Sequence, residues 1–223
     1  MTGKAGRLDL TPPELVARKR KKFGFFDLDG NHPALDFVNT IETARVGKEY
    51  DWLVSYPDTI GWAERVGLIG AAQTEALIGL AYSDDADAEA WHRQVVDLRS
   101  LLRDMFTAVV QGVAIDRPLW NTFNAALRQA LQRIEVQAGS GEYRWDFPDV
   151  DRQPTGFLQP LIKAAADLLV SGDVRRLKQC ANPSCDWFFL DTSKNKSRRW
   201  CSMQGCGNRT KAQRYQRKHK ASS

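Results

Sequence analysis

All four cysteines of the chain lie in its last fifth, in two pairs of equal spacing. Four residues separate Cys180 from Cys185 and Cys201 from Cys206, and fifteen residues lie between the pairs. A zinc ion takes four soft donors in a tetrahedron, at about 2.3 Å for thiolate sulfur. Turn-forming residues inside each pair allow the chain to fold back and bring two thiolates to one metal. The spacing therefore predicts one structural zinc held by four cysteines.

Two alternatives exist for these cysteines. Disulfide bonds would need an oxidising compartment, and the first residues lack the basic start, apolar core and cleavage site of a secretory signal. Free cysteines in a core are the other alternative, but four cysteines placed by chance would rarely form two matched pairs. A site of four thiolates has no open position for water, so we expect the metal to stabilise the fold without doing chemistry.

Positive charge is concentrated around the cysteines. Residues 171–223 contain 13 Lys and Arg against 3 Asp and Glu, a net charge of +10, whereas residues 1–170 contain 19 against 24, a net charge of −5. This asymmetry favours a polyanionic partner, most commonly nucleic acid, over a tail that is merely solvated. A second basic run, at 18–22, ends a predicted helix, where it either complements the helix dipole or contacts phosphate.

The zinc site would organise the cations near it. Once both cysteine pairs are fixed, the segment between them is a loop held at both ends, and the segment after Cys206 is compatible with a helix. Basic side chains on this loop and on one helix face could contact phosphate, while Ala212, Tyr215 and His219 on another face pack on the module. The predicted nucleic-acid contacts are Lys194, Lys196, Arg198, Arg199, Arg209, Lys211, Arg214, Arg217 and Lys218.

Several residues in this segment have two predicted roles. Asn208 and Arg209 follow the last cysteine directly, so they either contact bases or hydrogen-bond the sulfurs. The aromatic residues at 187–189 and Trp200 could stack on unpaired bases, but we favour a role in the small apolar core that the module needs beside its metal.

Two segments resemble known families. The residues around the cysteines, ending in Cys-Gly-Asn-Arg at 206–209, resemble the CGNR zinc finger family. Residues 35–40, Leu-Asp-Phe-Val-Asn-Thr, resemble the signature of an N-terminal domain called ABATE that occurs in the same proteins. The resemblance implies a treble-clef-like zinc hairpin ahead of a basic helix, in a stress-related transcriptional regulator. It implies no biochemical activity for the ABATE domain.

Helical periodicity dominates the chain before the cysteines. The longest predicted helix follows an acidic cap at 83–87, which complements the helix dipole. Its inward residues would be Trp91, Val95, Leu98, Leu102, Met105 and Val109. Shorter helices are predicted at about 13–22, 33–40, 58–66, 71–81, 118–134 and 158–170.

Strands are predicted at two places only. The period changes to two on both sides of Gly-Ser-Gly at 139–141, which predicts a β-hairpin from 134–138 and 143–147, and the aromatic-rich residues 23–28 predict a short strand. The predicted fold is mainly α with one β-hairpin, as a helical N-terminal domain followed by a separate, small zinc module. The expected divisions are a flexible, basic segment at 1–22, the helical domain at 23–172 and the zinc module at 173–223.

Polar residues in the 35–40 segment are candidates for a ligand pocket. Asp36, Asn39 and Thr40 would lie on a helix beside Arg45 and could surround a small molecule. They could equally tie down the next loop, because buried polar groups must find hydrogen-bond partners. We favour the second interpretation, since the segment has no nucleophile or metal-ligand spacing. An enzyme site around Asp36, Asn39 and Arg45 is the least favoured alternative.

The function follows from these patterns. No apolar run approaches the roughly 20 residues of a membrane span, so we expect a cytoplasmic protein with no membrane partner. Glycine-rich phosphate loops, nucleophile elbows and metalloprotease helices are absent from the sequence, so we do not expect an enzyme. We predict a DNA-binding transcriptional regulator whose helical domain senses a small-molecule ligand or mediates assembly into a homo-oligomer. An RNA-binding protein and a zinc-stapled protein-interaction module are the alternatives.

Overall fold

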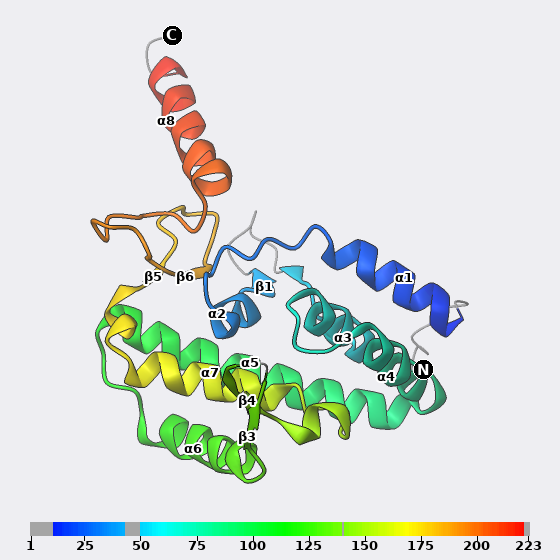
Figure 1. Cartoon of the computed structure of the whole chain (residues 1–223). Helices are drawn as coiled ribbons and strands as arrows, with labels where there is room; N and C mark the ends of the chain where they lie inside the picture. The colour runs from blue at the N-terminus through cyan, green and yellow to red at the C-terminus, as the bar shows by residue number, and fades with distance from the viewer. Residues whose placement is uncertain (1–10, 43–49, 140, 221–223) are drawn as a thin grey trace.

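The computed structural model describes residues 11–42, 50–139 and 141–220 (Figure 1). Within these residues the chain is mainly helical and contains three two-stranded antiparallel pairs. The helices are α1 (Pro12–Phe23), α2 (Pro33–Val38), α3 (Tyr56–Arg65), α4 (Ala71–Ser83), α5 (Asp85–Gln111), α6 (Arg117–Leu131), α7 (Leu158–Val170) and α8 (Asn208–Lys220). The strands are β1 (Ile41–Glu42) with β2 (Tyr50–Asp51), β3 (Glu135–Ala138) with β4 (Tyr143–Asp146), and β5 (Leu177–Gln179) with β6 (Phe188–Leu190).

The predicted helical fold with a β-hairpin is confirmed, and β1–β2 and β5–β6 are two short strand pairs in addition to it. The strand predicted at 23–28 is wrong, because Phe23 ends α1 and the residues after it are irregular. Phe26 is buried between Trp52 and Trp187, with ring centroids 5.2 and 5.8 Å away. The aromatic residues of this segment therefore reflect packing rather than a strand.

Helix α5 is the central element of the helical body, as its periodicity predicts. The carboxylate of Asp84 caps it by accepting from the amides of Ala86 and Asp87, both at 3.0 Å. Gly112 ends it in the left-handed region at φ 68°, where glycine has no steric cost. The buried face of α5 packs against α3, α4 and α6, and α7 packs against α6 and α2. None of the described helices combines the length and the apolar character that crossing a bilayer requires.

Helix α1 lies within the segment that we predicted as flexible and basic, yet it packs on α3 and α4. Leu15 and Val16 are buried in this contact, and the ammonium of Lys19 forms a buried ion pair with Asp58 at 2.8 Å. Gly61 permits the close approach, since a Cβ there would lie 2.7 Å from the Cβ of Lys19. In the structure, α1 is part of the helical body.

The zinc module follows the helical body in sequence but shares its core. Phe188 and Phe189 of β6 are fully buried, and the ring centroid of Phe188 lies 6.4 Å from that of Phe106 on α5. This confirms that the aromatic residues at 187–189 serve a core. That core, however, also contains residues of the helical body and does not belong to the zinc module alone. Helix α8, in contrast, projects away from the rest of the molecule (Figure 1).

Candidate metal centre and nucleic-acid interface

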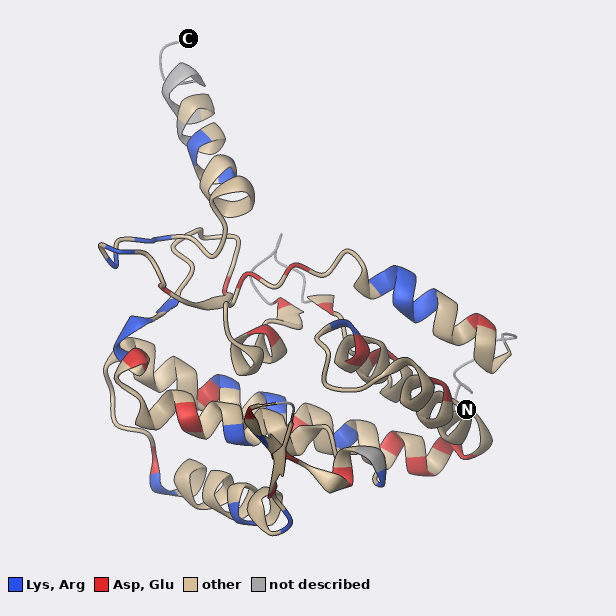
Figure 2. Cartoon of the chain, viewed as in Figure 1, with Lys and Arg blue, Asp and Glu red and all other residues tan. Residues whose placement is uncertain are grey.

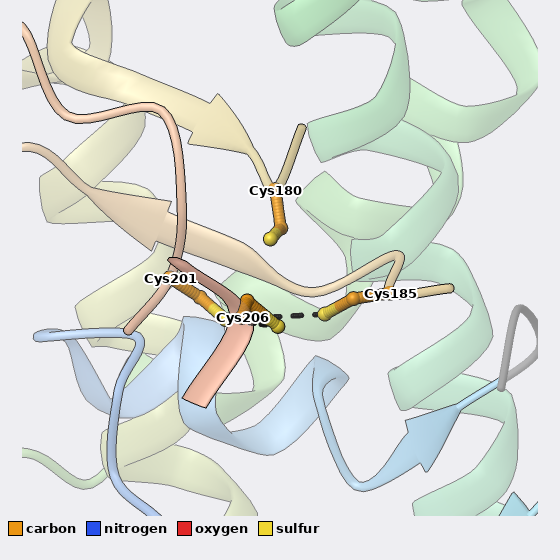
Figure 3. Close-up of side chains that lie close together, drawn as sticks. All are labelled: Cys180, Cys185, Cys201 and Cys206. Atoms are coloured by element: carbon orange, nitrogen blue, oxygen red, sulfur yellow. Dashed lines mark hydrogen bonds between the residues drawn. The ribbon is translucent and has the colours of Figure 1, made fainter. Parts of the chain in front are cut away.

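The four cysteines are brought together by two turns of the zinc module. Cys180 follows β5 and Cys185 precedes β6, so the first pair lies in the turn of the β5–β6 hairpin. The amide of Cys180 donates to the carbonyl of Trp187 at 2.9 Å, which closes this turn. Cys206 lies in a single π-helical turn, Met203–Gly207, that leads into α8. Figure 3 shows the four buried side chains gathered around one point.

The sulfur positions match a tetrathiolate zinc site. All four Sγ atoms lie within 4.8 Å of one another, and Cys201 Sγ lies 3.8 Å from Cys185 Sγ and 3.7 Å from Cys206 Sγ. A tetrahedron with zinc–sulfur bonds of about 2.3 Å has sulfur–sulfur edges of about 3.8 Å. A disulfide would need about 2.05 Å, and the cysteines are all free. The site holds one structural zinc.

Side chains beside the cysteines hold the second turn in place. Asn182 is buried, and its amide nitrogen donates to the carbonyl of Cys206 at 3.3 Å while its amide oxygen accepts from Ser184 N at 2.9 Å. The hydroxyl of Thr210 also donates to the Cys206 carbonyl, at 2.8 Å. Asn182 therefore ties the first cysteine pair to the second. The sequence indicates Asn182 only as a turn-forming residue between the first two cysteines, and no sequence pattern indicates a role for Thr210.

Asn208 and Arg209, which follow Cys206, are exposed on α8. Among the contacts recorded for the described residues, neither side chain donates to a cysteine sulfur. Asn182 and Thr210 instead support the last ligand through its backbone carbonyl. Their predicted contact with nucleic-acid bases stays a prediction.

The loop between β6 and Cys201 is organised by the buried carboxylate of Asp191. Asp191 is fully buried and accepts from Lys178 Nζ at 2.6 Å, from Ser193 Oγ at 2.6 Å and from the Arg198 amide at 2.9 Å. Burial alone would raise the pKa of the Asp191 carboxyl, but these hydrogen bonds outweigh it and hold the pKa below its usual range. Lys178 Nζ also donates to the carbonyl of Lys196 at 2.6 Å. These hydrogen bonds tie the loop to β5.

The predicted cations of this loop fall into two groups. Lys194, Lys196 and Arg199 are exposed. Arg198 is partly buried, with its guanidinium 4.7 Å from the centre of the Phe189 ring and donating to the carbonyl of Cys201. The Arg198 side chain thus contacts the zinc module itself, whereas the other three side chains are exposed to solvent.

Helix α8 carries the remaining predicted cations. Arg209 and Lys211 are exposed, and the side chains of Arg214, Arg217 and Lys218 lie outside those that the structure describes. We predicted that Ala212 and Tyr215 would pack on the module. This is wrong for these two residues, since Ala212 is exposed and Tyr215 is 66% exposed, and the side chain of His219, the third residue of that predicted face, lies outside those that the structure describes. The buried Thr210 anchors the first turn of α8, and the helix extends from there away from the body (Figure 1).

The polar residues of 35–40 contact protein groups. The amide of Asn39 pairs with the backbone of Phe188, accepting from its N–H and donating to its carbonyl, both at 2.8 Å. The hydroxyl of Thr40 donates to the Phe37 carbonyl at 2.7 Å and accepts from Arg99 at 3.0 Å. These contacts support the structural interpretation of the segment over the pocket interpretation. Arg45 lies outside the described residues.

Asp36 is the third polar residue of this segment. Its carboxylate accepts from the Gly30 amide at 2.9 Å. Burial raises the pKa of the Asp36 carboxyl to about 7, although the hydrogen bond from Gly30 opposes the shift.

A cavity of about 360 Å³ occurs elsewhere in the helical body, between α1 and the start of α3. It is lined by Arg18, Lys19, Lys22, Val54, Ser55 and Asp58.

Comparison with protein-family models identifies both parts of the chain. Residues 31–172 match the ABATE family, described as "Putative stress-induced transcription regulator". The chain belongs to the ABATE family. Residues 176–219 match the CGNR zinc finger, which contains all four clustered cysteines. Both families are of regulatory or zinc-finger type rather than enzyme families. Among curated proteins, no match to the sequence was found.

The two matched regions meet in this ABATE-family protein at the contacts described above. Residues 35–40 lie near the start of the ABATE match, and β6 lies inside the CGNR match. Asn39 and Phe188 are 149 residues apart in sequence but are joined by a hydrogen bond from the Asn39 side chain to the Phe188 carbonyl. The zinc finger is therefore fixed to the body by the ABATE signature segment.

Proposed function

We propose that this ABATE-family protein is a transcriptional regulator that binds duplex DNA through the basic surface of its zinc module. This basic surface consists of Lys194, Lys196, Arg199, Arg209 and Lys211, all exposed. Figure 2 shows the cations of the loop and of α8 on the side of the molecule from which α8 projects. The observation that carries the proposal is that the Lys178–Asp191 pair ties down the loop that carries Lys194, Lys196 and Arg199, between the clustered cysteines, in the absence of any partner. Preordered charge loses less entropy on binding.

The shape of α8 favours duplex DNA over RNA. A projecting helix fits the major groove of B-form DNA, which is about 12 Å wide. The major groove of A-form RNA is deep and narrow and does not admit a helix. Single strands are usually held by aromatic residues that stack on bases. Of the predicted stacking residues, Trp187, Phe188 and Phe189 are buried in the core, and the half-buried Trp200 packs against that core.

The experiment is a binding titration by fluorescence anisotropy at several salt concentrations, with duplex DNA, duplex RNA and single strands as competing ligands. We expect duplex DNA to bind best and log K to fall with log salt by about 0.9 for each phosphate contacted. Replacing Arg209 and Lys211 by Ala should weaken binding and reduce this slope. Replacing the exposed Arg93 and Arg128 on α5 and α6 is the matched control and should change neither. Absence of binding at low salt would favour a protein-interaction module instead.

A further inference from the structure

Within the part of the chain that the structure describes, strand β6 pairs with a strand, β5, along one of its two edges. Its pairing with β5 sets Lys178 opposite Phe189. The backbone groups of Phe188 and the N–H of Leu190 face the other edge, where they hydrogen-bond Asn39 and Gly30 of the helical body. A strand edge without partners leaves N–H and carbonyl groups unsatisfied, which is costly when the strand is buried as β6 is. The helical body must therefore supply the missing partners.

Asn39 takes the place of a neighbouring strand. Its side-chain amide offers one acceptor and one donor, and both are used on the backbone of a single residue, Phe188, at 2.8 Å each. This is the pattern of two bonds that a residue of a paired strand exchanges with its opposite residue. Asn39 is fully buried, so no water competes for these bonds.

Asp36 completes the edge through Gly30. The carboxylate of Asp36 accepts from Gly30 N at 2.9 Å, and the carbonyl of Gly30 accepts from Leu190 N at 2.9 Å. A Cβ on Gly30 would lie 2.8 Å from the Asp36 carboxylate oxygen, so the position has no room for a side chain. Asn39 therefore bonds one residue of the outer edge of β6 directly, and Gly30, which Asp36 holds in place, bonds the next alternate residue.

Helix α5 reinforces the same junction. Arg103 donates to the carbonyl of Val38 at 3.3 Å and to the carboxylate of Asp186, which follows the ligand Cys185 directly. Its guanidinium also lies 5.6 Å from the centre of the Phe188 ring. One arginine therefore contacts the signature segment, the strand and the residue next to a zinc ligand.

We propose that residues 35–40 are a docking site for the outer edge of β6, and that this docking makes zinc binding and the folding of the helical body depend on each other. The β5–β6 hairpin takes its turn from Cys180 and Cys185, so loss of zinc releases the strand that Asn39 and Gly30 hold. Coupling of this kind is reciprocal, so a change in the docking site must also change zinc affinity. The proposal does not depend on nucleic acid being the partner.

The first test measures zinc affinity in full-length protein by competition with a chelator of known affinity. Asn39→Ala leaves Phe188 N–H and its carbonyl without partners, and we expect zinc affinity to fall by about tenfold or more. The matched control is Asn121→Ala on α6, where the asparagine is exposed; its zinc affinity should equal that of the parent. A folded Asn39→Ala protein with the parent's zinc affinity would overturn the proposal.

The second test needs no variant, so it decides the question even if Asn39→Ala fails to fold. Hydrogen exchange is measured on the parent with zinc bound and after zinc removal. We expect peptides spanning residues 30–40 and 98–110 to lose protection when zinc is removed, because their contacts with β6 are lost. Unchanged protection in both peptides would show that the stability of the helical body does not depend on zinc, and it would overturn the proposal.

Discussion

The ammonium of Lys178 lies 2.6 Å from the carboxylate of Asp191, thirteen residues away across the β5–β6 hairpin. The carboxylate is fully buried while the lysine is only partly so, and both groups also bind the backbone of the loop that follows β6. This pair determines the shape of the loop that carries Lys194, Lys196 and Arg199. It connects the order of the zinc module to its exposed charge.

Replacing Asp191 by Ala should therefore loosen the loop without removing a zinc ligand. Lys178 and the Arg198 amide would lose their partner in a buried place, and we expect a loss of about 2 kcal/mol in the free energy of unfolding. DNA affinity should fall while zinc content stays at one per chain. The control is Asp167→Ala, whose exposed pair with Lys163 should be worth well under 1 kcal/mol. Equal stability of the two variants would contradict this role for Asp191.

Asp36 should make stability depend on pH. Its pKa is raised to about 7 in the folded protein from an ordinary value of 3.8, so the folded state binds more protons than the unfolded state between these values. Its contribution is therefore largest below about pH 4 and is lost as the pH rises through 7, by up to about 4 kcal/mol. Urea unfolding of zinc-loaded protein at pH 5 to 8 measures this effect.

The matched variant for that experiment is Asp36→Asn, which cannot ionise. Zinc binding has its own pH dependence, since thiolates bind the metal, so the difference between parent and variant is the informative quantity. We expect the parent to lose stability relative to Asp36→Asn as the pH rises. If the free energies of unfolding of the two proteins changed in parallel with pH, the pKa of Asp36 would not be raised in the folded protein.

The close contact of α1 and α3 can be tested at Gly61. A methyl group at this position meets Lys19 and Phe23 at 2.7 and 3.0 Å, so Gly61→Ala should push the helices apart and cost about 1–3 kcal/mol. Gly79→Ala in α4 meets nothing within 4 Å and should instead stabilise the protein by up to about 1 kcal/mol. Thermal unfolding of both variants measures these effects, and destabilisation by both would point to a cause other than crowding.

Removal of a zinc ligand should affect the whole protein. If the zinc module were separate, as the sequence predicts, Cys201→Ser would unfold the module and leave the helical body nearly unchanged. The structure places Phe188 against Phe106 in one core, so we now expect the melting temperature of the body to fall as well. Calorimetry with metal analysis of parent and variant tests this. An unchanged melting transition of the body, with less than one zinc bound, would show that the two parts are independent.

The sequence determined the features that depend on local spacing. The two cysteine pairs define the metal site because ligand spacing within a turn is a local property. The periodicity of α5, together with its acidic cap at Asp84 and its terminal Gly112, defines that helix for the same reason. The excess of cations after residue 171 likewise needs no tertiary contact to be seen.

Tertiary structure alone decided what each polar residue binds. Asn39 could have faced a ligand, and its actual partner is the backbone of Phe188, 149 residues away. Every residue except proline carries the same backbone donor and acceptor, so no side-chain pattern near Phe188 could have pointed to Asn39. For a similar reason the spacing of Ala212 and Tyr215 suggested a packed face on α8, although both residues are exposed in the folded protein. Pairings between distant segments depend on where the chain puts them, and local sequence does not contain that information.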